Sequence, residues 1–198
     1  MIHSKEEYKE YLQADKRALG ITRKRPKFFA DEIWKFERAL RKYEYYHNLN
    51  IGKNPLFLIA KIFAHARYHH LSVKLGFSIP INVFNKGLSI AHYGSIVVNS
   101  KAVIGENCRI QENVTIGATG GSIKAPQLGN NIFIGSGARI IGDITVADNI
   151  AIGANAVVTK SFTENDITLG GGYLLRKLAI IIPRSLLKQY KFLEYIIN

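Results

Sequence analysis

The sequence predicts a mainly β fold, a parallel β-helix that follows an N-terminal α-helical region and precedes a C-terminal helical tail. Three observations predict this class. Branched aliphatic residues recur at every sixth position through residues 98–163, and glycine follows many of them. The residues before and after that stretch carry apolar faces at helical spacing.

The six-residue repeat is the strongest signal in the chain. A period of six fits neither an amphipathic helix nor an alternating strand, but it suits a triangular coil whose three short sides take six residues each. One interval of the repeat is skipped, at Ser122. The aliphatic side chains then stack into a buried column, each contributing roughly 1.5–3 kcal/mol before conformational entropy is subtracted. The column consists of Val98, Ile104, Ile110, Ile116, Leu128, Ile134, Ile140, Val146, Ile152 and Val158.

A second inward position lies four residues after the aliphatic one. Cys108, the only cysteine, occupies it, so we expect a core residue rather than a nucleophile, and no intramolecular disulfide can form. Glycine directly after the aliphatic position, as at Gly105 and Gly135, predicts corners where the backbone takes an unusual turn. The second inward positions are Ala102, Cys108, Val114, Ile132, Ala138, Ile144, Ile150 and Ala156.

Both ends of such a coil expose its column, so each end needs a non-repetitive cap. Residues 1–75 form the predicted helical region, with helices over 4–19, about 30–47 and about 56–75 that would cap the first coil. The β-helix occupies residues 76–163 and begins with one imperfect coil. Residues 164–198 complete an exit loop that begins near Lys160 and then form a basic amphipathic helical tail. We expect the tail to cap the open end of the coil, with a membrane or partner surface as the alternative.

The formal charge of +12 at pH 7 indicates an acidic partner, which could be nucleic acid, an anionic membrane, an acidic glycan or a phosphorylated cofactor. No nucleic-acid-binding motif accompanies the charge. No apolar run resembles a signal peptide or is long enough to span a bilayer, so we expect a cytoplasmic protein, with the inner face of the membrane as an alternative location. His65 and His69 are spaced to share a metal, yet no carboxylate or cysteine completes a set, so no metal is expected.

Two interruptions of the repeat are the candidate sites. Counting back six residues from Val98 places His92 in an aliphatic position. A neutral imidazole there could serve as a general base, and the alternative is a histidine bound to a backbone carbonyl in an irregular coil. Residues 117–127 predict a loop that leaves the coil and returns in register. Its glycine-rich backbone could approach phosphates or a pantetheine arm, with a plain insertion as the alternative.

Four segments carry a resemblance to a known family. Together with the repeat, they are similar to the left-handed β-helix, or hexapeptide-repeat, acyltransferases, and most closely to the serine acetyltransferase branch. The resemblance covers about residues 77–163. The segments are Gly87-Leu-Ser-Ile-Ala-His92, Val114-Thr-Ile-Gly-Ala-Thr-Gly120, Ile134-Gly-Ser-Gly-Ala-Arg-Ile-Ile-Gly142 and Ile152-Gly-Ala-Asn-Ala-Val-Val-Thr-Lys160.

The resemblance implies a left-handed coil, a homotrimer with active sites between neighbouring coils, acetyl-CoA as co-substrate and no metal. His92 matches the family's catalytic base, which deprotonates an acceptor hydroxyl for direct attack on the thioester. Lys160 matches a position near the cofactor's phosphates, where positive charge is favourable. The positions that match cofactor-binding segments are Gly120, Gly137, Ala138, Ala154, Ala156 and Lys160.

Three positions depart from the serine acetyltransferase pattern. Ala91 stands where an acidic residue precedes the base, the acidic partner of the imidazole falls near Pro80, and the second histidine falls at Ala125. The base is thus retained without the serine-specific contacts, which resembles the sugar and polysaccharide O-acetyltransferases of the same fold. Asn82, Asn85 or a main-chain carbonyl would then orient the imidazole, and both asparagines are candidate acceptor-binding residues.

The resulting hypothesis is an acetyl-CoA-dependent O-acetyltransferase that acts on a sugar hydroxyl of a surface polysaccharide or its precursor. A serine O-acetyltransferase is the alternative within the same chemistry. From a different class, the chain could be a non-catalytic trimeric scaffold that docks on a membrane through its basic helices.

Overall fold

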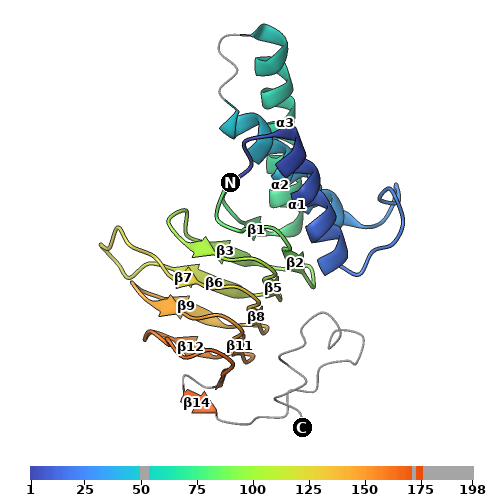
Figure 1. Cartoon of the computed structure of the whole chain (residues 1–198). Helices are drawn as coiled ribbons and strands as arrows, with labels where there is room; N and C mark the ends of the chain where they lie inside the picture. The colour runs from blue at the N-terminus through green and yellow to red at the C-terminus, as the bar shows by residue number, and fades with distance from the viewer. Residues whose placement is uncertain (50–53, 171–172, 176–198) are drawn as a thin grey trace.

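The structure, a computed structural model, describes residues 1–49 and 54–170 and the backbone of residues 173–175 (Figure 1). Three helices come first, α1 (Lys5–Ala18), α2 (Glu32–Asn48) and α3 (Pro55–Leu75), and they confirm the three predicted helices. Within the described residues no helix is long and apolar enough to cross a bilayer. The predicted C-terminal helical tail lies outside the described residues.

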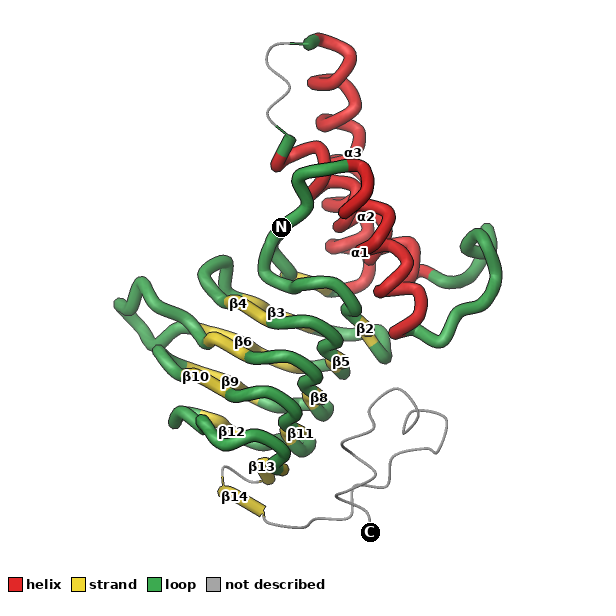
Figure 2. Tube along the Cα trace, in the orientation of Figure 1, coloured by secondary structure: helices red, strands yellow, loops and turns green. Residues whose placement is uncertain are grey.

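The rest of the described chain is the predicted left-handed parallel β-helix, whose strands form three sides (Figure 2). The first side contains β1 (Phe77–Ser78), β3 (Ile96–Val98), β6 (Val114–Gly117), β9 (Arg139–Ile141) and β12 (Val157–Val158). The second side contains β4 (Val103–Ile104), β7 (Gln127–Leu128) and β10 (Thr145–Val146). The third side contains β2 (Ser89–Ile90), β5 (Arg109–Ile110), β8 (Phe133–Ile134), β11 (Ala151–Ile152) and β13 (Thr168–Gly170), which pairs antiparallel with β14 (Tyr173–Leu175).

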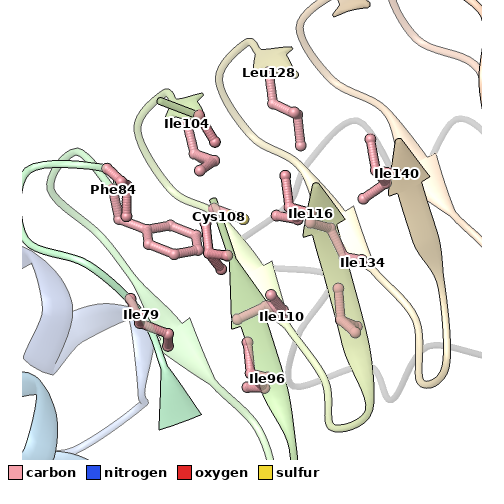
Figure 3. Close-up of a cluster of buried hydrophobic side chains, with 14 of the residues drawn as sticks. Ile79, Phe84, Ile96, Ile104, Cys108, Ile110, Ile116, Leu128, Ile134 and Ile140 are labelled. Atoms are coloured by element: carbon pink, nitrogen blue, oxygen red, sulfur yellow. The ribbon is translucent and has the colours of Figure 1, made fainter. Parts of the chain in front are cut away.

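The predicted aliphatic column fills the inside of the coil. All of its residues are at most 4% exposed, and Figure 3 shows several of them stacked from one coil to the next. The second inward positions are at most 6% exposed, so they complete the same core. Cys108 is among them and is buried, as the sequence predicts.

The glycines of the repeat are required for close packing between coils, so the prediction of unusual turns at these glycines is wrong. Neither Gly105 nor Gly135 has a positive φ. A Cβ on Gly105 would lie 2.5 Å from the carbonyl oxygen of Gly129, and one on Gly135 would lie 2.6 Å from the amide nitrogen of Ala154. The left-handed backbone falls instead on asparagines, with φ of 59° at Asn107, 56° at Asn131 and 59° at Asn149.

These three asparagines form a ladder along the corner between the second and third sides. Asn107 Nδ2 donates to Asn131 Oδ1 at 3.1 Å, and Asn131 Nδ2 donates to Asn149 Oδ1 at 2.8 Å. Asparagine tolerates the left-handed conformation better than most residues because its short amide can hydrogen-bond locally. The ladder therefore both turns each coil and links it to the next.

A buried charge cluster joins the N-terminal helices to the first coil. Arg41 of α2 is fully buried and donates to the Asp15 carboxylate at 2.7 Å and to the Glu44 carboxylate at 2.9 Å. The same guanidinium donates to the carbonyl oxygens of Phe84 and Asn85 at 2.8 and 2.7 Å. It thus satisfies carbonyls that would otherwise be unpaired at the open end of the coil.

Carboxylates of α1 and α2 satisfy amide groups at the same end. An unpaired strand edge leaves N–H groups without partners and can template aggregation, so the first coil needs this cover. The amides of Gly87 and Leu88 donate to Asp15, that of Ile90 to Glu37 and that of Asn82 to Glu44, at 2.8–3.0 Å. The helices therefore cap the first coil, as the sequence predicts.

The coil continues beyond its predicted end. The interpretation of residues 160–172 as an exit loop is wrong for most of that stretch, because Phe162 bridges to Val146 on the second side and β13 pairs with β11 on the third. Leu169, paired with Ile152, is 0% exposed and extends the core by one more position. The count by six misses this coil because it is one to two residues shorter than the regular eighteen.

Candidate active site

His92 lies at the corner between the third and first sides, outside the aliphatic column. Strand pairing aligns Ile90, not His92, with Ile110 of the next coil, and Ile90 is 1% exposed. The prediction that His92 occupies an aliphatic position is therefore wrong. The first coil carries two extra residues between Ile90 and Val98, so the count from Val98 reaches an exposed side chain. Exposure at the corner leaves the imidazole accessible to a substrate.

Glu112 occupies the same corner in the next coil. The strand register continues past Ile90, with the Ala91 amide donating to the Ile110 carbonyl at 2.9 Å, so Glu112 is the counterpart of His92. The turn after His92 packs onto Glu112, because a Cβ on Gly94 would lie 3.1 Å from the Glu112 Cβ. A carboxylate on the neighbouring coil therefore lies beside the candidate base.

The Glu112 carboxylate is held by one hydrogen bond and keeps one oxygen unpaired. Ser136 Oγ donates to Glu112 Oε1 at 2.6 Å, whereas the buried Oε2 has no hydrogen-bond partner among the described residues. The Ser136 hydrogen bond, with smaller contributions from its own backbone and the charge of His92, lowers the pKa of Glu112. The carboxylate is thus ionised at neutral pH, and it can accept an N–H from an imidazole and stabilise the imidazolium formed during proton transfer.

Four of the predicted cofactor-binding residues fall along the same corner. Gly137 and Ala138 follow β8, and Ala154 and Ala156 follow β11, in the two coils beyond Glu112. The Gly137 amide donates to the Glu112 carbonyl at 3.0 Å, which shows that these turns are stacked. Ala138 and Ala156 are 0% exposed, so only their backbone can meet a ligand, while the Ala154 side chain is exposed.

The other two cofactor-binding candidates lie at the corner between the first and second sides. Gly120 belongs to the loop over residues 118–126, which leaves the coil between β6 and β7, and a Cβ there would have no neighbour within 4 Å. Lys160 is exposed after β12. Strand β6 separates this corner from that of His92, a width of about 13 Å. One chain therefore presents His92 and the loop at opposite edges of its first side.

Asn82 and Asn85 lie away from His92, beneath the N-terminal helices. The Asn82 amide exchanges two hydrogen bonds with the Asn48 amide at 2.8 and 2.9 Å. Asn85 Oδ1 accepts from the Tyr11 hydroxyl at 2.5 Å. Both side chains thus contribute to the helix–coil junction on the second side, opposite the corner of His92, and the structure does not bring them together with the imidazole.

Glu112 and Ser136 were missed from the sequence, although a signal for them existed. His92, Glu112, Ser136 and Ala154 each follow a third-side column residue by two positions. With Ile90 recognised as the first column residue, this common offset predicts that the four residues line one edge. The wrong register at Val98 concealed it.

Other candidate chemistry is separate from this edge. Burial raises the pKa of the Cys108 thiol, so this cysteine is not a nucleophile near neutral pH. Among the described residues no group of three metal-ligating side chains could hold an ion, and the rings of His65 and His69 lie 6.2 Å apart.

Sequence comparison finds serine acetyltransferases, while no family model matches the chain. The chain is 35% identical over 88 residues to a serine acetyltransferase of Synechococcus elongatus. This match covers 43% of the chain and 36% of that protein. Over 87 residues it is 37% identical to the enzyme of Helicobacter pylori, 51% of whose length is covered. The chain thus matches about a third to a half of the length of these curated relatives.

Comparison with solved structures also finds serine acetyltransferases. Soybean serine acetyltransferase superposes with a TM-score of 0.63 at 25% identity, covering 86% of this chain and 69% of that one. The chain resembles the serine acetyltransferases. The Brucella abortus serine acetyltransferase, solved in complex with coenzyme A, superposes with a TM-score of 0.61 at 26% identity. This superposition covers 86% of this chain and 68% of that one. This serine acetyltransferase-like architecture extends beyond the stretch matched in sequence and includes much of the helical region.

Proposed function

We propose that the chain is an acetyl-CoA-dependent O-acetyltransferase with His92 as its general base. The observation that carries this proposal is the edge on which an exposed imidazole lies beside an ionised carboxylate and is followed by turns that match cofactor-binding segments. The resemblance to acyltransferases of the same coil supports the cofactor, because one of these relatives is solved with coenzyme A.

The proposed reaction is a direct transfer. His92 takes the proton of the acceptor hydroxyl as its oxygen attacks the carbonyl carbon of the acetyl thioester. The carbon–sulfur bond then breaks, and the departing thiolate receives the proton from the imidazolium. The Glu112 carboxylate orients the ring and offsets its transient charge. No acyl-enzyme is needed, in agreement with the burial of Cys108.

The relatives favour L-serine as the acceptor, ahead of the sugar hydroxyl that the sequence alone suggests. Both sequence relatives above are serine acetyltransferases, and a Neisseria gonorrhoeae serine acetyltransferase is solved in complex with serine. A sugar acceptor is the second candidate, because two positions lack the charged side chains that would bind an amino acid. Ala91 and the buried Ala125 offer no charged group for the ammonium or carboxylate of an amino acid.

A homotrimer would complete the site. His92 and the loop of Gly120 lie at opposite edges of the first side, so the loop of a neighbouring chain is needed to face the base. Exposed apolar residues on that side, Val97 at 43% and Val157 at 51%, support its burial against another coil. Acetyl-CoA would then lie between two chains, with Lys160 near its phosphates.

The test is acetyl-CoA-dependent thiol release with L-serine and, separately, with sugar acceptors. Turnover with L-serine supports the leading acceptor, and turnover with sugars alone reverses the order. If the protein neither binds acetyl-CoA in calorimetry nor releases thiol, the chain is a non-catalytic scaffold.

A further inference from the structure

A cationic cavity lies between the helices and the loop that joins α1 to α2. It has a volume of about 380 Å³, and its walls include Tyr8 of α1 and the turn at Pro26 and Phe28. No carboxylate of the described residues lines it. Its cationic residues are Arg25, Lys27, Lys35, Arg38, Lys42 and Arg67, drawn from the loop, α2 and α3.

Most of this positive charge is not neutralised by ion pairs within the part of the chain that the structure describes. Lys35 is engaged, since its ammonium donates to the Phe28 carbonyl at 2.7 Å and lies 3.4 Å from Glu32. Arg38 lies against the Trp34 ring, at 5.8 Å from its centroid. The other four cations make no ion pair with the described residues. A cavity with this charge selects a ligand that carries phosphate or another concentrated negative charge.

The loop that builds one wall is organised by Asp31. This residue has a left-handed backbone with φ of 65°, and its carboxylate pairs with Arg23 and accepts from the Lys27 amide at 2.8 Å. One side chain therefore holds both arms of the loop in place. The cationic wall is a built feature of the fold.

Two exposed phenylalanines adjoin the cavity, since Phe28 lines it and Phe29 packs against Phe28. Phe28 is 84% and Phe29 is 92% exposed, and their rings pack edge to face with centroids 4.7 Å apart. A third exposed ring, that of Phe63, lies one helical turn before Arg67 on α3, so it is on the same face as that cavity residue. Large apolar side chains next to uncompensated cations are typical of surfaces that enter the headgroup region of a bilayer.

We infer that this surface docks the protein on an anionic phospholipid membrane. A lipid phosphate group enters the cationic cavity while Phe28 and Phe29 insert at the boundary between headgroups and acyl chains. A free phosphorylated solute would leave both rings in water, so it does not account for them. A second copy of the chain, related by two-fold symmetry, would bring two such cavities together and is disfavoured by repulsion.

Co-sedimentation of the full chain with vesicles tests the inference. We expect binding to phosphatidylcholine vesicles that contain about a third phosphatidylglycerol, no binding to pure phosphatidylcholine, and release at high salt. Lys27→Glu should weaken binding roughly tenfold or more, while the matched reversal Lys101→Glu on the coil should not. Phe29→Ser should weaken binding roughly tenfold, whereas Val103→Ser, which also changes an exposed apolar residue, should not.

Three results would overturn the inference. The first is equal affinity of the protein for neutral and anionic vesicles, or equal affinity of the Lys27→Glu and Lys101→Glu variants for anionic vesicles. The second is tight binding of inorganic pyrophosphate in calorimetry without any vesicle binding, which assigns the cavity to a free ligand. The third is a change in molar mass of Phe29→Ser in light scattering, which assigns the rings to contact between copies. Circular dichroism confirms that each variant is folded.

Discussion

Ser136 Oγ donates a 2.6 Å hydrogen bond to Glu112 Oε1, while Oε2 of the same carboxylate has no hydrogen-bond partner among the described residues. This hydrogen bond links two successive coils along the edge that also carries His92. The carboxylate that the sequence alone did not provide for the imidazole thus lies on the next coil. We propose Glu112 as a positioning residue for His92.

Replacement of Glu112 by Gln should lower kcat roughly tenfold to a hundredfold, since the general base is retained but its orientation and charge partner are lost. Ser136→Ala should have a smaller effect, because the carboxylate of Glu112 stays ionised at neutral pH and loses only the hydroxyl that holds it. Measurement of kcat for both variants at neutral pH checks this, and a larger loss in Ser136→Ala than in Glu112→Gln would contradict it.

Arg41→Met should destabilise the protein by about 3–5 kcal/mol, because it leaves the buried carboxylates of Asp15 and Glu44 without their charge partner. The first coil also loses two carbonyl contacts. Urea unfolding measures the change in the free energy of unfolding. Exposed Arg17→Met is the matched control and should change that free energy by less than about 0.5 kcal/mol. A similar value for both variants would mean that the cluster does not cap the coil.

Stability should fall as the pH rises because of Glu37. Burial and the neighbouring charge of Asp15 raise the pKa of this carboxyl well above its usual value. In this situation the folded protein holds the proton while the unfolded chain releases it, so the free energy of unfolding decreases with pH above the usual carboxyl range.

The variant Glu37→Gln removes that proton and retains an acceptor for the Ile90 amide. It should therefore flatten the dependence between about pH 5 and pH 8 and be more stable than the parent at pH 8. Urea unfolding at both pH values is the measurement. Parallel pH dependences of parent and variant would show that Glu37 is not the group responsible.

Gly105→Ala should cost about 1–3 kcal/mol, because the new Cβ meets the backbone of the next coil at Gly129. Gly120→Ala should cost far less, because nothing lies within 4 Å of its Cβ position. Thermal unfolding of the two variants distinguishes packing between coils from loss of glycine in general. Equal losses would contradict the packing explanation.

The sequence predicted the fold closely because burial repeats with the geometry of the coil. Every column residue from Val98 to Val158 is buried, and helix periodicity located the three helices of the described residues. The failures occur where a coil departs from eighteen residues. Two extra residues after Ile90 shifted the position assigned to His92, and a short last coil hid β13.

The site was only half predictable. His92 was found by counting back from Val98 and through motif resemblance. Glu112 could be found only by knowing which residue of the next coil lies beside His92, and that is set by the strand register. The role of the asparagines was also concealed, since Asn82 and Asn85 contact helices that are distant in sequence. The repeat does not encode those contacts.

The most direct test compares thiol release from acetyl-CoA, with L-serine as acceptor, for the parent protein and His92→Ala. General-base catalysis predicts that the variant loses turnover by roughly 10²- to 10⁴-fold while calorimetry shows unchanged binding of coenzyme A. Equal turnover by parent and variant would contradict the assignment of His92 as the base.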